Sequence, residues 1–419
     1  MKQLAVALAA IGLTTSIGVY AALPTGAQAT EVNAPQEADD YFFGASGLLW
    51  QPTVSGNDLD YAVSQSGSNT NQQIHNIKLG YDWGFDFFAG YNFGNGANVI
   101  FEYLRLHTKE DSANTAPAGG NIIPAHYFAT NSSLLFQNSQ SSNSNLNNFD
   151  TYQRGYGRVN LDFDQADLTV GQNLNIGCSD QLRLFTGLRY SQIEREINTN
   201  YSQNPNSAGN TNLGSGVTVS AVNNVAGVPI VASHGALQGT EDDSNFKGIG
   251  PLVGLNNTYY LGYGIGFVSE FEMGLLIGDV YDDLTLTNYQ AGVTTITSST
   301  TGLVTSSTAN GAENITTTVV NTDDARRVVP VVDAKLGFDY TFPFQDYGSF
   351  TLEAGWSVSH YWHAVDGINS GASDANLINS TDGSTLVNGI TNIVPTFHTN
   401  SVGYQGPYVT LTYHGISFI

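Results

Sequence analysis

A period-two alternation of apolar and polar residues recurs along this chain and constrains its fold more than any other feature. In residues 348–360, which read GSFTLEAGWSVSH, every second residue from Phe350 to Val358 is apolar, and the residues between them are polar or small. Successive side chains of a β-strand point to opposite faces, so the pattern predicts a strand with one oily face and one polar face. The oily face lies either in the core of a soluble sandwich or against lipid, in a barrel whose polar face lines a lumen.

The alternation is repeated in residues 182–190, 264–278 and 328–341. Their polar faces hold Gly, Ser and Thr with scattered charges, which suits a crowded, curved interior better than a water-exposed surface. Aromatic residues near the strand ends are placed as interfacial girdles would be. These aromatic residues are Trp50, Tyr81, Trp83, Tyr259, Tyr260, Tyr281, Tyr340, Tyr361 and Trp362.

One strand changes phase. Val159, Leu161 and Phe163 are apolar at odd positions, whereas the apolar residues from Ala166 to Val170 stand at even positions. A β-bulge near residues 164–165 would restore a single oily face, and two separate short strands are the alternative.

The first 29 residues have the features of a secretory signal: one lysine, an apolar stretch over residues 4–13 and a small-x-small site ending at Ala29. Cleavage after Ala29 is the first choice and cleavage after Ala21 the second. Polar residues 14–16 disfavour an N-terminal membrane anchor. No later uncharged apolar run reaches the roughly 18 residues of a spanning helix, so membrane residence would have to be as a barrel.

Short links and long polar tracts alternate along the chain. The short links lie at residues 94–96, 177–180, 261–264 and 343–348, and the long tracts at about 108–155, 199–245, 288–324 and 365–403. A compact soluble domain seldom holds four such long loops, whereas outer-membrane barrels have short periplasmic turns and long extracellular loops. The predicted fold is therefore an all-β, transmembrane antiparallel β-barrel over residues 41–419, after a short periplasmic segment at 30–40.

The expected strand number is ten. Each short link joins two strands, and the stretches near residues 41–50 and 406–419 add a first and a last. Residues 59–64 and 74–81 also look extended, so twelve strands are possible, and eight is the lower limit. An even number places both ends of the barrel on the periplasmic rim.

Several segments resemble a known family. FGASGLLWQP at residues 43–52, GFDFFAGYNF at 84–93, VIFEYLRLHT at 99–108, LDFDQADLTVG at 161–171 and QGPYVTLTYHGISFI at 405–419 are similar to the Legionella-type major outer-membrane-protein family of pore-forming barrels. The resemblance implies an outer-membrane β-barrel of a Gram-negative bacterium that passes small solutes, with surface loops open to host contact. The end of the chain departs from the common assembly signal, because Phe418 is penultimate and Ile419 is last.

Composition excludes several function classes. Lys and Arg total 13 against 36 Asp and Glu, a net charge of −23, which repels phosphate backbones and excludes nucleic-acid partners. The single cysteine, Cys178, cannot form a disulfide within the chain and is expected to be inert. His360 and His363 point to opposite sides of a strand, so no metal site is expected. No cofactor motif or catalytic grouping is found, and we expect no enzyme.

The charged residues that are predicted to point into the lumen are the best indication of function in this sequence. The strand parity directs seven acids to the lumen, opposed by Arg183, Arg189 and Lys335. The acids are Asp162, Asp164, Glu270, Glu272, Asp333, Asp339 and Glu353. Pairing among these charges that plugs the barrel is one interpretation; an acid-biased aqueous path that favours cations is the other.

Two functions follow from these alternatives. The first is a porin-like barrel through which small hydrophilic solutes or ions diffuse, with a mild preference for cations. The second is a surface adhesin or structural barrel with a closed lumen, acting through its long loops. Outer-membrane lipid and the barrel-assembly machinery are the expected partners in either case, and the sequence does not fix the oligomeric state.

Overall fold

The computed structural model describes residues 40–56, 58–65, 72–118, 120–125, 135–137, 152–177, 179–202, 211–212, 218–219, 236–290, 294–298, 305–309, 314–322, 325–344, 348–372, 375–379, 385–390 and 393–415. The predicted signal peptide at 1–29, most of the segment at 30–40, Cys178 and the C-terminal Phe418 and Ile419 lie outside these residues. Within them, no helix is long and apolar enough to cross a membrane.

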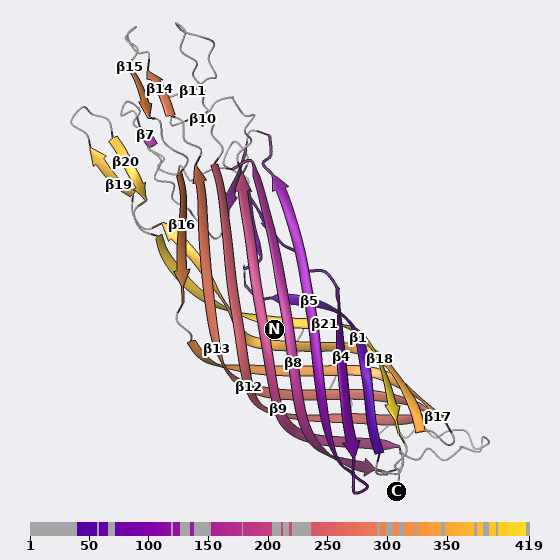
Figure 1. Cartoon of the computed structure of the whole chain (residues 1–419). Coiled ribbons are helices and arrows are strands. Elements are labelled where there is room, and N and C mark those ends of the chain that lie inside the picture. Colours follow the sequence, from indigo (N-terminus) through magenta and orange to yellow (C-terminus); the bar gives the residue numbers. More distant parts are fainter. Residues whose placement is uncertain are drawn as a thin grey trace.

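Ten long strands form one antiparallel sheet that closes on itself (Figure 1). Around the ring the order is β12, β9, β8, β5, β4, β1, β21, β18, β17 and β13, and β13 pairs back with β12. These strands are β1 (Asp40–Val54), β4 (Asp82–Asn92), β5 (Ala97–Thr115), β8 (Arg154–Ile176), β9 (Asp180–Ser202), β12 (Ala236–Gly262), β13 (Ile265–Gln290), β17 (Ala325–Phe344), β18 (Gly348–Ala372) and β21 (Ile393–His414). The predicted transmembrane barrel and its ten strands are confirmed.

Short connections lie on one rim of the barrel. β8 and β9 pair up to Ile176 and Asp180, and Gly177 between them has φ +74°, a conformation that glycine adopts without strain. β1 and β21 also meet at this rim, where Phe42 pairs with His414. Both ends of the barrel sheet therefore lie beside the short turns, as an even strand count requires.

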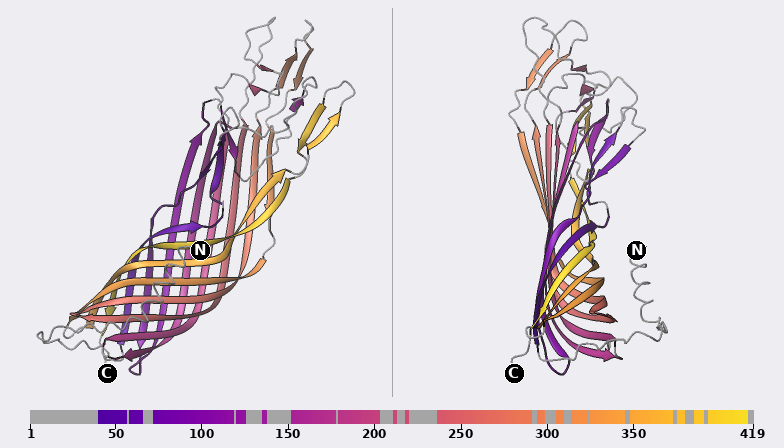
Figure 2. Two further views of the ribbon diagram at one scale, coloured as in Figure 1. Left: turned by 180° about the vertical axis from the view of Figure 1, so that it is seen from behind. Right: turned by 90° about the vertical axis from the view of Figure 1, so that its right-hand side faces the viewer.

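Shorter strands gather toward the other rim (Figures 1 and 2). Residues 59–64 and 74–81, which had suggested two further barrel strands, contribute to β2 and β3 of a separate three-stranded sheet with β6. The shorter strands are β2 (Asp60–Gln65), β3 (Gln72–Asn76), β6 (Asn121–Pro124), β7 (Leu135–Gln137), β10 (Thr211–Asn212), β11 (Thr218–Val219), β14 (Thr294–Ser298), β15 (Thr305–Ala309), β16 (Asn314–Asn321), β19 (Ala375–Asn379) and β20 (Thr385–Ile390).

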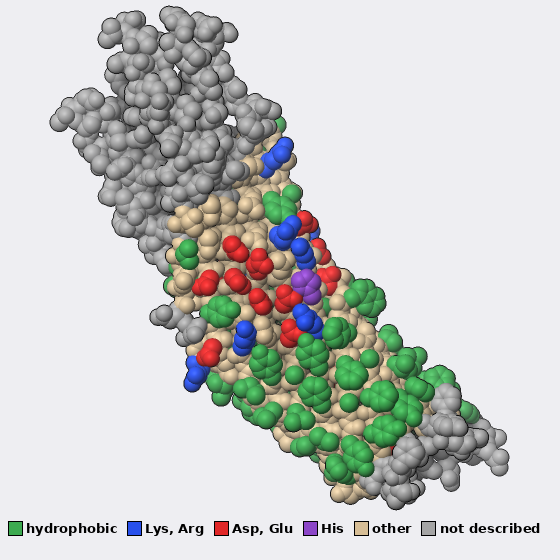
Figure 3. All heavy atoms as spheres, viewed as in Figure 1, with side chains coloured by type: hydrophobic (Ala, Val, Ile, Leu, Met, Phe, Trp, Pro, Cys, Tyr) green, Lys and Arg blue, Asp and Glu red, His purple; other side chains and the backbone are tan. Residues whose placement is uncertain are grey.

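The outer surface of the barrel is divided into two zones. Near the short turns the outward side chains are mostly apolar: in β13 all of those from Ile265 to Ile277 except Ser269 are apolar, and the next outward residue, Asp279, is charged. Figure 3 shows hydrophobic side chains covering this half and a belt of charged side chains beyond it. The apolar zone is the part of a barrel that lipid solvates, because its side chains have no protein partner on that face.

The inner surface changes polarity at the same level, in the opposite sense. In β9, inward Arg189 and Ser191 lie behind outward Leu188 and Tyr190, whereas Ile193 points inward behind polar Gln192. Within the apolar zone, most of the charged residues of these strands thus point into the barrel, whereas beyond it many inward residues are apolar and buried. Apolar side chains packed inside a barrel are the pattern of a water-soluble core, and buried polar groups such as Arg195 lie among them.

This inversion explains the phase change in β8, where the predicted bulge is wrong. β8 pairs with both neighbours without a register shift from Arg154 to Ile176. Odd residues, including Phe163, point inward throughout, and even residues, including Leu168, point outward. The apolar residues change sides because the strand leaves the lipid zone, not because an extra residue is inserted.

The aromatic girdle needs a related correction. Tyr81, Trp83, Tyr259 and Tyr340 are exposed on the outside, as a girdle requires. Trp50 and Tyr361, in contrast, are buried inside the barrel.

Candidate pore

The interior of the barrel is organised in levels, beginning with a charged layer inside the apolar zone. This layer contains eight carboxylates and three cationic side chains, supplied by strands from all around the ring. Its members are Asp86, Glu102, Asp167, Glu270, Glu272, Asp333, Asp339 and Glu353, with Arg183, Arg189 and Lys335. Above it, toward the far rim, lie an aromatic layer and then a second group of charges at the mouth.

Arg189 is the most buried cation of the charged layer. Its guanidinium donates to Asp167 of β8, with Nη2 at 2.7 Å from Oδ2, and to Glu272 of β13 at 2.5 Å. It also donates to Asp333 of β17, which accepts a further hydrogen bond from Ser359. One guanidinium thus joins four strands, which is possible because its five donors form a fixed fork.

Lys335 forms the second centre of the layer. Its ammonium lies 3.2 Å from Glu270 Oε1 and 3.7 Å from Glu102 Oε1. Two further carboxylates accept hydrogen bonds from neutral groups: Tyr408 donates to Glu353 at 2.5 Å, and Ser46 donates to Asp86 at 3.0 Å.

The charged layer carries an excess of acid, and it is not tightly packed. Arg183 donates to Asn98 and Thr169, so Arg189 and Lys335 alone form ion pairs with the carboxylates of this layer in the described strands. Although they point inward, the Lys335 and Glu102 side chains remain 26% and 24% exposed. Water can therefore reach these two side chains inside the barrel.

The structure sorts the predicted pore-lining residues into two groups. Arg189, Glu270, Glu272, Asp333, Lys335, Asp339 and Glu353 face the lumen within the charged layer. Asp162 and Asp164 do not: they lie on the outer face of β8, where Asp162 is 2.6 Å from His107 and Asp164 is 3.8 Å from Arg105. Their assignment to the lumen was wrong because it assumed the bulge in β8.

Three lumen acids were missed by the sequence reasoning: Asp86, Glu102 and Asp167. The first two carry a usable signal. Asp86 stands between Phe85 and Phe87, and Glu102 between Phe101 and Tyr103, so an acid at the centre of an aromatic pair on one face must point to the other.

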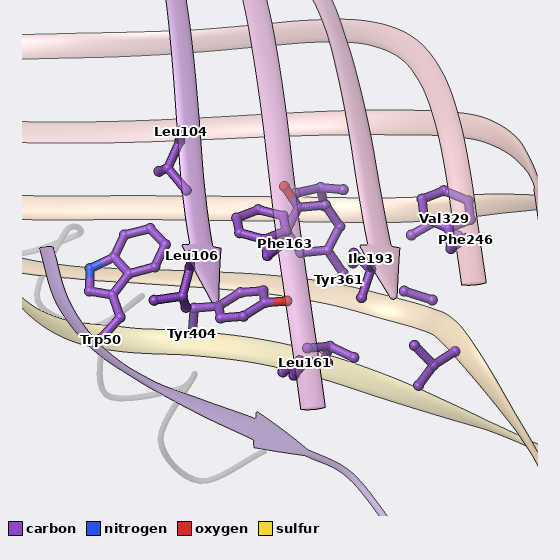
Figure 4. Close-up of a cluster of buried hydrophobic side chains, with 14 of the residues drawn as sticks. Trp50, Leu104, Leu106, Leu161, Phe163, Ile193, Phe246, Val329, Tyr361 and Tyr404 are labelled. Atoms are coloured by element: carbon purple, nitrogen blue, oxygen red, sulfur yellow. The ribbon is translucent and has the colours of Figure 1, made fainter. Parts of the chain in front are cut away.

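The aromatic layer lies inside the barrel beyond the charged layer, and Figure 4 shows its rings gathered between the strands. Phe163 of β8 stacks on Tyr404 of β21 with ring centroids 4.4 Å apart and meets Tyr361 of β18 edge-on at 5.4 Å. Trp50 lies against Tyr404 and donates from its indole to Ser357. The core cluster to which these rings belong draws residues from nine of the ten barrel strands, and none is more than 4% exposed.

Contacts in this layer cross the barrel. β8 and β18 stand five places apart in the ring of ten, so Phe163 and Tyr361 join opposite walls. The barrel is correspondingly narrow in side view (Figure 2). The Tyr404 hydroxyl is buried here without a hydrogen-bond partner among the described residues. A buried hydroxyl without a partner costs about 1–3 kcal/mol, which offsets part of the gain from burying the Tyr404 ring.

The mouth cluster lies beyond the aromatic layer and is built around Arg195 of β9. Its guanidinium donates to Asp58 at 2.6 Å and to Asp242 at 3.0 Å, and lies 3.7 Å from Asp282. His398 of β21 forms an ion pair with Asp58 on the other side. All of these groups lie above the apolar zone.

The ionisation of the mouth cluster is set by burial and by Arg195. Burial, with Asp242 adding to it, raises the pKa of Asp282 to about 9 although Arg195 opposes the shift. Burial also acts to raise the pKa of Asp58, but Arg195 and the hydrogen bond with His398 outweigh it, and the pKa lies below its ordinary value. The same hydrogen bond raises the pKa of His398. Within the described residues, no group of three or more His, Cys, Asp or Glu could hold a metal ion.

Several solved structures resemble this barrel at low sequence identity. The outer membrane protease OmpT from Escherichia coli is 9% identical, with a TM-score of 0.37 over 91% of this chain and 99% of OmpT. A Pseudomonas aeruginosa FadL homologue is 10% identical, with a TM-score of 0.25 over 90% of each chain. The P. putida toluene transporter TodX is 10% identical, with a TM-score of 0.27 over 92% of this chain and 91% of TodX. None of these likenesses bears on function.

No curated protein matches the sequence. The family model described as Legionella pneumophila major outer membrane protein precursor, in contrast, matches residues 33–415. Because that match spans nearly the whole chain, the protein belongs to the Legionella major outer membrane protein family, and its barrel is one of the outer membrane.

Proposed function

We propose that this protein is a porin-like channel of the outer membrane that passes small hydrophilic solutes and ions and prefers cations. The observation that carries the proposal is the charged layer, in which eight carboxylates face three cationic side chains and inward groups keep exposed area. Rings of carboxylates in a lumen favour cations over anions. The proposal assigns no catalytic step to the protein.

The acid excess favours transport over a purely structural interior. Removing an uncompensated carboxylate from water is costly, so a barrel that needed only stability would balance its buried charges or replace them with apolar groups. Glu353 and Asp86 have neutral hydrogen-bond partners and no cationic partner in the described strands. Their charge is satisfied at little cost if mobile cations share the lumen with water.

In this proposal the described conformation is a closed one, and the aromatic layer is its constriction. Conduction requires the rings of Phe163, Tyr361 and Tyr404 to move apart, which would also hydrate the Tyr404 hydroxyl. Polar loops on the far rim face the cell exterior, and the barrel-assembly machinery inserts the barrel with its short turns in the periplasm.

Conductance in planar bilayers tests the function directly. We expect stepwise currents from the folded protein and, in a potassium chloride gradient, a reversal potential that shows preference for potassium. Glu353→Gln removes one lumen charge and keeps an acceptor for Tyr408, so it should reduce that preference. Asp162→Asn removes the same charge from the outer face and should leave the preference unchanged.

The aromatic layer favours one alternative, a closed structural barrel that acts through its long loops. Under this alternative the wild type never conducts, whereas Tyr404→Ala, which removes a ring from the contact between the walls, produces currents. Silent wild-type protein whose folding is verified by its heat-modifiable mobility would overturn the channel proposal. Removal of residues 288–324 should then lower cell attachment.

A further inference from the structure

The chain between β1 and β4 enters the mouth of the barrel. With β6 it builds a small sheet in the order β3–β2–β6, which together with Asp58, Ile77 and Leu79 we call the cap. Tyr61, Ala62 and Ile77 of the cap are almost completely buried. A connecting segment that only crossed the surface would leave such side chains in water.

The cap packs on the inner wall of β8 and β9. Its apolar residues form one cluster with Val159, Ile197 and Tyr201, all of which point into the barrel. The Tyr201 hydroxyl donates to the Tyr61 carbonyl. At Gly157 a Cβ would lie 2.7 Å from Tyr61 Cγ, so the absence of a side chain makes room for the cap inside the wall.

Asp58 of the cap joins opposite walls. It accepts from Arg195 of β9 and pairs with His398 of β21, and these two strands stand five places apart in the ring of ten. At Gly367 of β18 a Cβ would meet the same carboxylate at 2.9 Å. Arg195 is itself held by Asp242 of β12 and lies near Asp282 of β13. The carboxylate therefore clamps the two walls directly above the aromatic layer.

We propose that the cap is a latch that holds the lumen closed, and that conduction requires its withdrawal from the mouth. This inference rests on the proposed channel function. While Asp58 bridges β9 and β21, the walls cannot separate and the aromatic layer below them stays in contact. When the cap leaves, Arg195 and His398 lose their shared anion, so this link between β9 and β21 above the aromatic layer is broken.

A disulfide between the cap and the wall tests the latch. A Cβ at position 155 on β8 would lie 3.4 Å from the Ala62 Cβ, just below the range of about 3.5–4.5 Å seen in disulfides. The variant is Ala62→Cys with Gly155→Cys, in a Cys178→Ser background so that the two new thiols are the only ones. We expect the oxidised protein to lose its conductance and a reducing agent to restore it.

The single variants Ala62→Cys and Gly155→Cys, treated with the same oxidant, control for the substitutions themselves and should conduct in both redox states. Mass spectrometry verifies the cross-link in the oxidised protein. If the cross-linked protein conducts like the wild type, the cap does not need to withdraw for conduction. Wild-type protein that never conducts would instead remove the channel function.

A second measurement examines the cap without relying on conduction. Ala62 is 0% exposed, so in the Cys178→Ser background a thiol reagent reaches the single variant Ala62→Cys only when the cap opens. Asp58→Asn removes the charge that bridges the walls and should speed the labelling of Cys at position 62. Equal labelling rates with and without Asp58→Asn would refute the latch.

Discussion

At the scale of single residues, the Asp58–His398 pair gives the cap a pH dependence with a defined sign. The pKa of His398 is raised while Asp58 is bound, and returns toward about 6.5 when the cap withdraws. The pair therefore contributes fully below about pH 6.5, and this contribution is lost as the pH rises through the raised pKa. The lowered pKa of Asp58 matters only in acid. There the contribution of the pair is lost as the pH falls below 3.8, the ordinary pKa of an aspartate, toward the lowered pKa of Asp58.

We accordingly expect Cys at position 62 to be labelled more slowly at about pH 5.5 than at about pH 8.5, after correction for the thiolate fraction measured in unfolded protein. His398→Ala should reduce this difference, and the part that remains is expected from Asp282, whose pKa of about 9 makes it begin to lose its proton over the same range. Other groups facing the pair are Arg195, which stays charged, and Asp242 and Asp282 on the neighbouring strands. The same pH profile in both backgrounds would contradict the role given to His398.

At the scale of single strands, the sequence predicts correctly which side chains share a face of the strand. It does not predict whether that face contacts lipid, water or the barrel core. The alternation in β13, β17 and β18 correctly separates inward Glu272, Asp333 and Glu353 from their outward neighbours. In β8 the same alternation continues along the whole strand, but the two halves of the strand lie in different environments. Val159 and Phe163 are apolar because they pack in a dry core, and Leu168 is apolar because it faces outward in the lipid zone. Periodicity alone cannot distinguish these two causes.

The cap could not be predicted from its own residues. β2 and β3 were recognised as extended, yet neither their pattern nor their length shows that they enter the barrel. The position of the cap depends on Gly157, Arg195 and His398, which belong to three distant strands. Those contacts exist only once the ring has closed, so they leave no local signal in the sequence.

At the scale of the whole molecule, the change of polarity divides the barrel into a lipid-solvated half and a water-solvated half. A lysine placed on the outer face should distinguish them. Leu275 and Thr285 both point outward from β13, the first within the apolar zone and the second beyond it. Leu275→Lys should destabilise the folded barrel by about 2–4 kcal/mol. Thr285→Lys should change its stability by less than about 0.5 kcal/mol.

Reversible unfolding in urea from lipid vesicles measures both values, with the wild type as reference. Similar costs for the two variants would mean that lipid does not end where the outward residues of β13 become charged.

The pairing of β1 with β21 has a consequence for biogenesis. Phe42 meets His414, so the seam of the ring joins residues from opposite ends of the polypeptide. Until β21 has been synthesised, every partial product has two unsatisfied strand edges, and such edges are templates for aggregation. The ring therefore closes only after β21 has been made, and before that the sheet cannot satisfy all of its backbone groups within a bilayer.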